Sequence, residues 1–200
     1  MEIPEVHIMS RIDWQVFGTL TFKGESLTCG RRQKMWFAEL RALSRWQHVH
    51  FSRLLWVLRV EQGEATGRTH FHCLIGGLPE TAVMGGITFR RADGSLDCGN
   101  RLTHALEGKW ARLGLNPADK QNRISRFSLY DARLNGASYI IKCLGEENAG
   151  RLSKDIYETA KFMWDDRQLI LSDSVHRVVE RLTGLSACSG RSYRSVGRSE

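Results

Sequence analysis

Three stretches in the first half of the chain have the composition or the alternation of β-strands. Residues 13–22 (DWQVFGTLTF) are rich in aromatic and β-branched side chains. Residues 54–62 (LLWVLRVEQ) and 68–77 (RTHFHCLIGG) also read as strands, and residues 54–58 are apolar on both faces, as in a central strand. The glycine-flanked residues 63–68 therefore predict a hairpin loop between the second and third strands.

Other stretches repeat their apolar residues at helical spacing. Residues 31–46 place Trp36, Leu40 and Leu43 on one face among several arginines, with Thr28 as the expected N-cap. This pattern predicts an amphipathic helix that covers one face of the sheet and exposes its arginines to solvent. The other helices that we expect are residues 100–113, 134–146, 152–162 and 174–182.

Shorter apolar segments complete the pattern. Residues 87–91 and 95–98 flank the turn signal at residues 92–94 and predict a small β-ribbon, either a clamp for a nucleic-acid strand or a peripheral flap. Residues 123–130 should return to the sheet, and residues 168–171 form a short apolar segment. The predicted fold class is α+β, with helices packed on a central antiparallel sheet.

Composition is that of a soluble globular protein. Hydrophobic residues make up 42% of the chain and charged residues 26%. No apolar run approaches the ~20 residues of a membrane span, and the N-terminus lacks the features of a signal peptide. We expect one domain over residues 1–183, located in the cytoplasm, and a disordered, basic Ser/Gly/Arg-rich tail over residues 184–200.

Cysteine usage indicates the state of the thiols, and net charge indicates the kind of partner. The five cysteines are odd in number and never form a C-x-x-C pair, which favours reduced thiols over a disulfide framework or a zinc knuckle. The net charge of +7 favours a polyanionic partner.

Candidate chemistry begins with two histidines on the third predicted strand. His70 and His72 flank Phe71, and successive side chains of a strand point to opposite faces. The two imidazoles should therefore share one face, while Phe71, Cys73 and Ile75 fill the other. This spacing suits one metal ion, although strand histidines are also found as ordinary hydrogen-bonded residues.

The register of the predicted hairpin adds a carboxylate. If Gln62 pairs with Thr69, Glu61 lies directly opposite His70, and Arg59 lies opposite the second histidine on the same face. Two imidazoles and one carboxylate with open positions suit several divalent metals. A slip of one residue would move Glu61 to the other face.

The third predicted helix, residues 134–146, carries a tyrosine and a lysine. Tyr139 and Lys142 are three residues apart and hence neighbours on one helical face. Ile140, Ile141 and Leu144 are expected to pack the other side. Taken alone, such a pair is more often surface packing than a catalytic pair.

Three motifs in a fixed order resemble a known family. FGTLTF at residues 17–22, HFH at residues 70–72 and YIIK at residues 139–142, with Glu61 before the histidines, resemble the HUH endonucleases. The closest resemblance is to the single-tyrosine replication initiators (Rep proteins) of rolling-circle plasmids, phages and small single-stranded DNA viruses. It spans about residues 14–145. Relaxases place the tyrosine before the histidines, so this chain does not match that branch.

The resemblance implies a fold and a set of roles. The family's sheet is of ferredoxin or RNA-recognition-motif type, with a metal on one face and the tyrosine helix beside it. By this resemblance, Glu61, His70 and His72 bind Mg²⁺ or Mn²⁺, Tyr139 is the nucleophile, and Lys142 assists at the phosphate. A phenol, with its pKa of about 10, needs such help to ionise near neutral pH.

The resemblance also implies a reaction and partners. Tyrosine attack on single-stranded DNA at an origin stem-loop would leave a 5′-phosphotyrosine link and a free 3′-hydroxyl, and the reverse reaction would rejoin the strand. The chain contains no G-x-x-x-x-G-K-[ST] motif, so helicase and polymerase would be separate proteins. We expect Lys23, Arg59 and Arg68 near the DNA path. The compartment would be a bacterial cytoplasm, or the nucleus for a protein of a eukaryotic virus.

Two other functions remain open. A single-tyrosine transposase of the insertion-sequence type has the same order of H-x-H and tyrosine, but the longer C-terminal region and the Y-x-x-K motif favour an initiator. A non-catalytic nucleic-acid-binding module would explain the charge and the fold. It would leave Tyr139 and the histidine cluster without a role.

Overall fold

The computed structural model describes residues 9–22, 29–62, 69–91, 94, 96–112, 125–134, 136–141 and 169–183. The strands of the main sheet are β1 (Trp14–Thr21), β2 (Leu55–Gln62), β3 (Thr69–Gly76), β6 (Arg126–Leu129) and β7 (Leu169–Leu171), and a separate ribbon pairs β4 (Ile87–Arg90) with β5 (Leu96–Gly99). The helices are α2 (Cys29–Trp46), α3 (Glu80–Val83), α4 (Arg101–Arg112), α5 (Gly136–Ile141) and α7 (Asp173–Thr183), with 3₁₀ turns η1 (Phe51–Arg53) and η2 (Ala132–Leu134).

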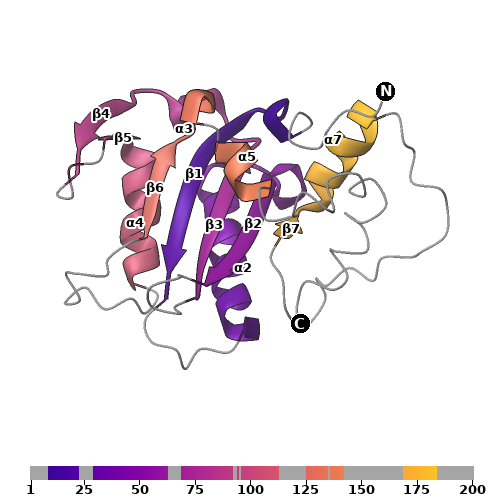
Figure 1. Cartoon of the computed structure of the whole chain (residues 1–200), viewed down its shortest axis with the longest axis horizontal. Helices are drawn as coiled ribbons and strands as arrows, with labels where there is room; N and C mark the ends of the chain where they lie inside the picture. The colour runs from indigo at the N-terminus through magenta and orange to yellow at the C-terminus, as the bar shows by residue number, and fades with distance from the viewer. Residues whose placement is uncertain are drawn as a thin grey trace.

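The main sheet is antiparallel throughout and has the order β6-β1-β3-β2-β7. Without the edge strand β7, the elements β1, α2, β2, β3, α4 and β6 form the βαββαβ arrangement of ferredoxin-like folds, in which β3 lies between β1 and β2. Figure 1 shows α5 in front of this sheet and α2 behind it. The predicted α+β class and antiparallel sheet are confirmed.

One face of the sheet is covered by α2 and α4. Trp36, Leu40 and Leu43, predicted to line one face of the first helix, are all buried here. They pack with alternate residues of the strands, such as Leu20 of β1 and Phe71 of β3. Burial of these large apolar side chains is the main source of stability for this layer, because each contributes about 1.5–3 kcal/mol on transfer from water.

The opposite face carries α5 and α7. Ala137 and Ile140 of α5 are buried against this face together with Val57 of β2, Leu74 of β3 and Val175 of α7. Ile140, which was expected to pack on the side of the helix away from Tyr139 and Lys142, is indeed buried. This apolar layer covers only part of the face, and the polar residues of β2 and β3 lie further along the same strands.

Gly18 permits β1, β3 and β6 to approach closely on the α2/α4 face. A Cβ atom at this position would lie 2.6 Å from Sγ of Cys73 and 2.9 Å from Cε1 of Phe127. Both neighbours are fully buried and cannot move aside easily. The glycine in FGTLTF is thus explained by packing.

The ribbon is fastened to the main domain by an ion-pair network. Arg91 pairs with Asp97 of β5 and donates to Glu107 Oε1 of α4 at 2.7 Å. Phe127 N of β6 donates to the same Glu107 oxygen at 2.9 Å. Asn100 caps α4, since its side-chain oxygen accepts hydrogen bonds from the backbone N–H groups of Leu102 and Thr103.

Some predicted boundaries differ from those observed. The strand expected over residues 123–130 is observed as β6, and the helix expected from Leu134 begins at Gly136 as α5. Asp131 causes this shift, because its backbone oxygen accepts from Leu134 N and its side chain accepts from Arg133 N, which closes η2 first. The predicted loop at 63–68, residues 142–146, the helix at 152–162, Thr28 and the tail at 184–200 lie outside the described residues.

Within the part of the chain that the structure describes, no helix is both long enough and apolar enough to cross a membrane.

Candidate metal centre

The register of the β2–β3 hairpin is the one that the sequence predicted. Gln62 pairs with Thr69, Glu61 with His70, and Arg59 with His72. Because side chains of directly opposed residues share a face, the carboxylate and both imidazoles come together on the face that carries α5. The hairpin alone supplies the three groups.

The three groups are close enough to share one ion. Oε2 of Glu61 lies 3.2 Å from Nε2 of His70 and 3.0 Å from Nε2 of His72. One ligand atom from each residue can be chosen so that all lie within 4.8 Å of one another. Two neutral imidazoles and a carboxylate are a donor set that binds divalent cations. Glu61, His70 and His72 can therefore hold a metal ion.

Burial keeps one imidazole in the form that binds metal. The pKa of His72 falls from 6.5 to about 4, chiefly because burial disfavours the charged ring. Glu61 opposes this shift, while the positive charges of His70 and Arg59 add to it. His72 is thus neutral near pH 7, and a neutral ring nitrogen can donate its lone pair to a cation.

Thr19 of β1 orients His72 from the other side. Its Oγ1 lies 3.0 Å from Nδ1 of His72, directly across the β1–β3 pairing. When the ring proton is on Nδ1, it is donated to Thr19 and Nε2 is left to face Glu61. Sequence analysis gave Thr19 no role. The signal was present in FGTLTF, but only the pairing of β1 with β3 links it to His72.

Arg59 is buried beside the cluster, with 4% of its surface exposed. Its Nη2 pairs with Oε1 of Glu61, and its Nη1 donates to the backbone oxygen of Ile140 in α5 at 3.4 Å. Arg59 was expected near the DNA path, which stays a prediction. Its guanidinium lies between the carboxylate of the cluster and the helix that covers the sheet.

The other predicted site residues are described only in part. Tyr139 belongs to α5 and directly precedes Ile140, and the structure describes its backbone. Lys142, Lys23 and Arg68 lie outside the described residues. The structure therefore brings together Glu61, His70 and His72.

The cluster is accessible from one side. The side chains of Glu61 and His70 keep 16% and 20% of their surface exposed, and that of His72 keeps 10%. Deep burial of all three would exclude a substrate, and full exposure would not hold the rings in place. The intermediate exposure leaves part of each of the three side chains in contact with solvent.

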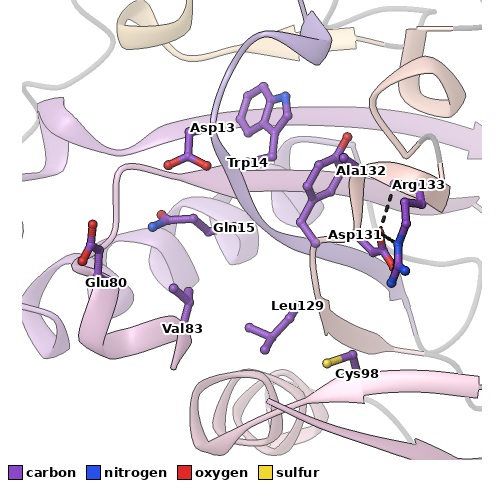
Figure 2. A pocket seen from close by; sticks show the side chains of 11 residues that line it. Asp13, Trp14, Gln15, Glu80, Val83, Cys98, Leu129, Asp131, Ala132 and Arg133 are labelled. Atoms are coloured by element: carbon purple, nitrogen blue, oxygen red, sulfur yellow. Dashed lines mark hydrogen bonds and ion pairs between the residues drawn. The ribbon is translucent and has the colours of Figure 1, made fainter. Parts of the chain in front are cut away.

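A separate hollow of about 550 Å³ lies at the start of β1, between α3 and η2 (Figure 2). Its lining includes the carboxylates of Asp13, Glu80 and Asp131, and Arg133 holds the pKa of Asp131 below its usual value through a hydrogen bond. The side chain of Gln15 donates a hydrogen bond to the backbone oxygen of Leu78 and accepts one from the backbone N–H of Leu78. None of the cluster residues lines this hollow, so the cluster and this hollow are in different places.

No family model, no curated protein and no solved structure matches the chain.

Proposed function

We propose that the protein is a metal-dependent HUH endonuclease and strand transferase of the single-tyrosine replication-initiator type. It nicks single-stranded DNA at a replication origin, becomes linked to the 5′ end through a phosphotyrosine, and rejoins strands by the reverse reaction. A single observation carries the proposal: Glu61, His70 and His72 meet on a face of a βαββαβ sheet, and the helix of Tyr139 packs on that same face.

The covalent step is an exchange of one phosphate ester for another. The phenol oxygen of Tyr139 forms a bond to the scissile phosphorus, and the bond from phosphorus to the 3′ oxygen breaks. The phenol gives its proton to solvent and the departing 3′ oxygen takes one up. The number of ester bonds is unchanged, so neither nicking nor joining requires an external source of energy. Lys142 favours the ionised phenol and balances charge on the phosphate.

The cluster residues hold the cation and set its position. A bound Mg²⁺ or Mn²⁺ supplies positive charge that polarises the scissile phosphate. Glu61 provides the negative charge of the site, and His72, neutral because of its burial, is held at Nδ1 by the hydroxyl of Thr19. The carboxylate oxygen favours the harder ions Mg²⁺ and Mn²⁺.

Recognition of DNA rests on charge. The chain carries a net charge of +7, and neutralisation of phosphates by Lys and Arg makes such binding sensitive to salt. Lys23 follows β1 in sequence and Arg68 directly precedes β3, the strand that begins with Thr69 and His70. In sequence each is two residues from a member of the Thr21–His70 pair of β1 and β3, which favours both as phosphate contacts.

The test is formation of a covalent adduct. The protein is incubated with stem-loop single-stranded oligonucleotides and Mn²⁺, and adducts are separated on a denaturing gel and mapped by peptide mass. We expect attachment at Tyr139, none in Tyr139→Phe, and a slower but detectable reaction in Lys142→Ala. Tyr130→Phe is the matched control, because a Cβ atom at Gly136, where the same helix starts, would lie 3.2 Å from the ring of Tyr130.

Three results would contradict the proposal. They are attachment at another tyrosine, an undiminished adduct from Tyr139→Phe, and cleavage that persists in His70→Ala and His72→Ala after EDTA treatment. Binding to DNA without any adduct would return the protein to the class of nucleic-acid-binding modules.

A further inference from the structure

We propose that Arg59 is a positioning residue that links the carboxylate of the metal cluster to the nucleophile helix α5. This inference rests on the proposed function for its effect on cleavage. The link itself is a property of the fold and can be measured without DNA.

The guanidinium of Arg59 contacts two parts of the protein at once. Nη2 pairs with Oε1 of Glu61, while Nη1 donates to the backbone oxygen of Ile140, the residue after Tyr139. The planar, forked arrangement of the guanidinium allows both contacts from one side chain. Movement of the Glu61 carboxylate is thereby connected to the backbone of α5.

The same contact determines which carboxylate oxygen faces the histidines. Because Arg59 engages Oε1, Oε2 is the oxygen that lies 3.0–3.2 Å from the two Nε2 atoms. A freely rotating carboxylate could offer both oxygens to a cation. Arg59 therefore favours binding through Oε2 alone, which leaves more coordination positions for a phosphate.

Burial argues against a role in stability alone. Arg59 is 4% exposed, and removing a charged group from water is costly, so that a buried ion pair is often no more stable than apolar side chains of similar size. A leucine or methionine on β2 would pack under α5 without this penalty. The guanidinium supplies what those residues lack, which is a directional bond to a metal ligand and to a helix.

The positive charge of Arg59 should also affect Mn²⁺ affinity and adduct formation in opposite ways. A unit positive charge next to the cluster repels a divalent cation. Replacement by methionine, of similar length, should therefore tighten Mn²⁺ binding, by about tenfold, while the loss of the link slows adduct formation at saturating Mn²⁺ by at least about tenfold. If Arg59 acted only through folding, its replacement would lower both the Mn²⁺ affinity and the rate of adduct formation.

The experiment compares wild type, Arg59→Met, Arg59→Lys and the control Arg133→Met. Arg133 pairs with Asp131 just before α5, but its side chain is 89% exposed and lies outside the cluster. Mn²⁺ affinity is measured by calorimetry, adduct formation by single-turnover kinetics, and the coupling by hydrogen exchange of the α5 amides with and without Mn²⁺. Circular dichroism confirms that each variant is folded.

We expect Mn²⁺ to change exchange in α5 of wild type and of Arg133→Met, and to have little effect in Arg59→Met. Arg59→Lys should keep Mn²⁺ affinity within about threefold of wild type but still cleave slowly, because one ammonium group cannot make both contacts. Equal coupling in wild type and Arg59→Met, or Mn²⁺ binding that weakens in Arg59→Met, would overturn the inference. If wild type forms no adduct, the proposed function fails, and the exchange data still decide the role of Arg59.

Discussion

Thr19 Oγ1 lies 3.0 Å from Nδ1 of His72, its direct partner across the β1–β3 pairing. The hydroxyl belongs to a strand far from the hairpin in sequence, yet it meets the ring nitrogen of His72 that faces away from Glu61. Outer partners of this kind are worth about 10–100-fold in metal affinity or activity.

Thr19→Val should therefore weaken Mn²⁺ binding by about tenfold without unfolding the protein, since valine has the shape of threonine without its hydroxyl. Thr88→Val is the control, because Thr88 is exposed on β4 in the separate ribbon, away from the cluster. Calorimetric titration with Mn²⁺ measures the effect. Equal affinities in the two variants would show that Thr19 does not orient the ring.

Removal of the cluster's carboxylate should affect both stability and metal response. In Glu61→Gln the buried guanidinium of Arg59 loses the negative charge of Glu61, which should lower the free energy of unfolding by about 3 kcal/mol. The double variant Glu61→Gln/Arg59→Met should recover most of this loss. Urea denaturation checks both values, with exposed Glu80→Gln as the control.

The same variants test the effect of metal on folding. An ion that binds only the folded state raises the midpoint of thermal unfolding in proportion to ln(1 + [L]/Kd). Mn²⁺ should raise the midpoint of wild type, EDTA should reverse the rise, and Glu61→Gln should show neither effect. A shift that persists in Glu61→Gln would place the ion elsewhere.

Gly18→Ala should destabilise the protein by about 1–3 kcal/mol, because the added methyl group overlaps Sγ of Cys73 and the ring of Phe127. Gly18→Ala/Cys73→Ala removes the closer of the two overlaps and should regain part of the loss. A double-mutant cycle in urea gives the coupling energy. Additive effects of the two substitutions would mean that the strands separate rather than repack.

Folding stability should decline in mildly acidic solution because of His176. Burial lowers the pKa of His176 in the folded protein, and nearby Asp173 opposes this only in part. Below about pH 6.5 the unfolded chain takes up a proton at this ring that the folded protein binds less well, so stability is complete above that pH and is lost as the pH falls. Buried His72 adds to this loss between pH 6.5 and about 4.

The contribution of His176 is isolated by comparing variants. Thermal unfolding between pH 7.5 and 5 should show a shallower decline for His176→Asn than for wild type, at a fixed EDTA concentration. His104→Gln, on the exposed side of α4, serves as the control and should follow wild type. Identical pH profiles for wild type and His176→Asn would contradict the assignment.

The hairpin at the centre of the site could be predicted because its determinants are local. Alternation along β2 and β3 and a glycine-flanked loop fix which residues oppose each other, so Glu61 was placed opposite His70 from sequence alone. The helix of Trp36 was predicted for the same reason, since its periodicity lies within one element.

The remaining parts depend on contacts that alternation does not encode. Two strand pairings link segments that are distant in the chain. β1 pairs with β3, which places Thr19 opposite His72, and β2 pairs with β7, which places Arg59 opposite Leu169. The burial of Arg59 likewise depends on how α5 covers the sheet. Sequence could assign the face of Arg59 but not its partner Ile140.

The pleat of β3 also determines which metals the site can distinguish. Cys73 follows His72 directly, but its thiol points into the α2/α4 core, where burial raises its pKa. Sulfur, the donor that binds Cd²⁺ and Cu⁺ most strongly, is thus kept on the far side of the sheet from the imidazoles, although it is one residue away in sequence. Thiophilic ions that reach the cluster therefore meet the nitrogen and oxygen atoms of Glu61, His70 and His72 and not the sulfur of Cys73.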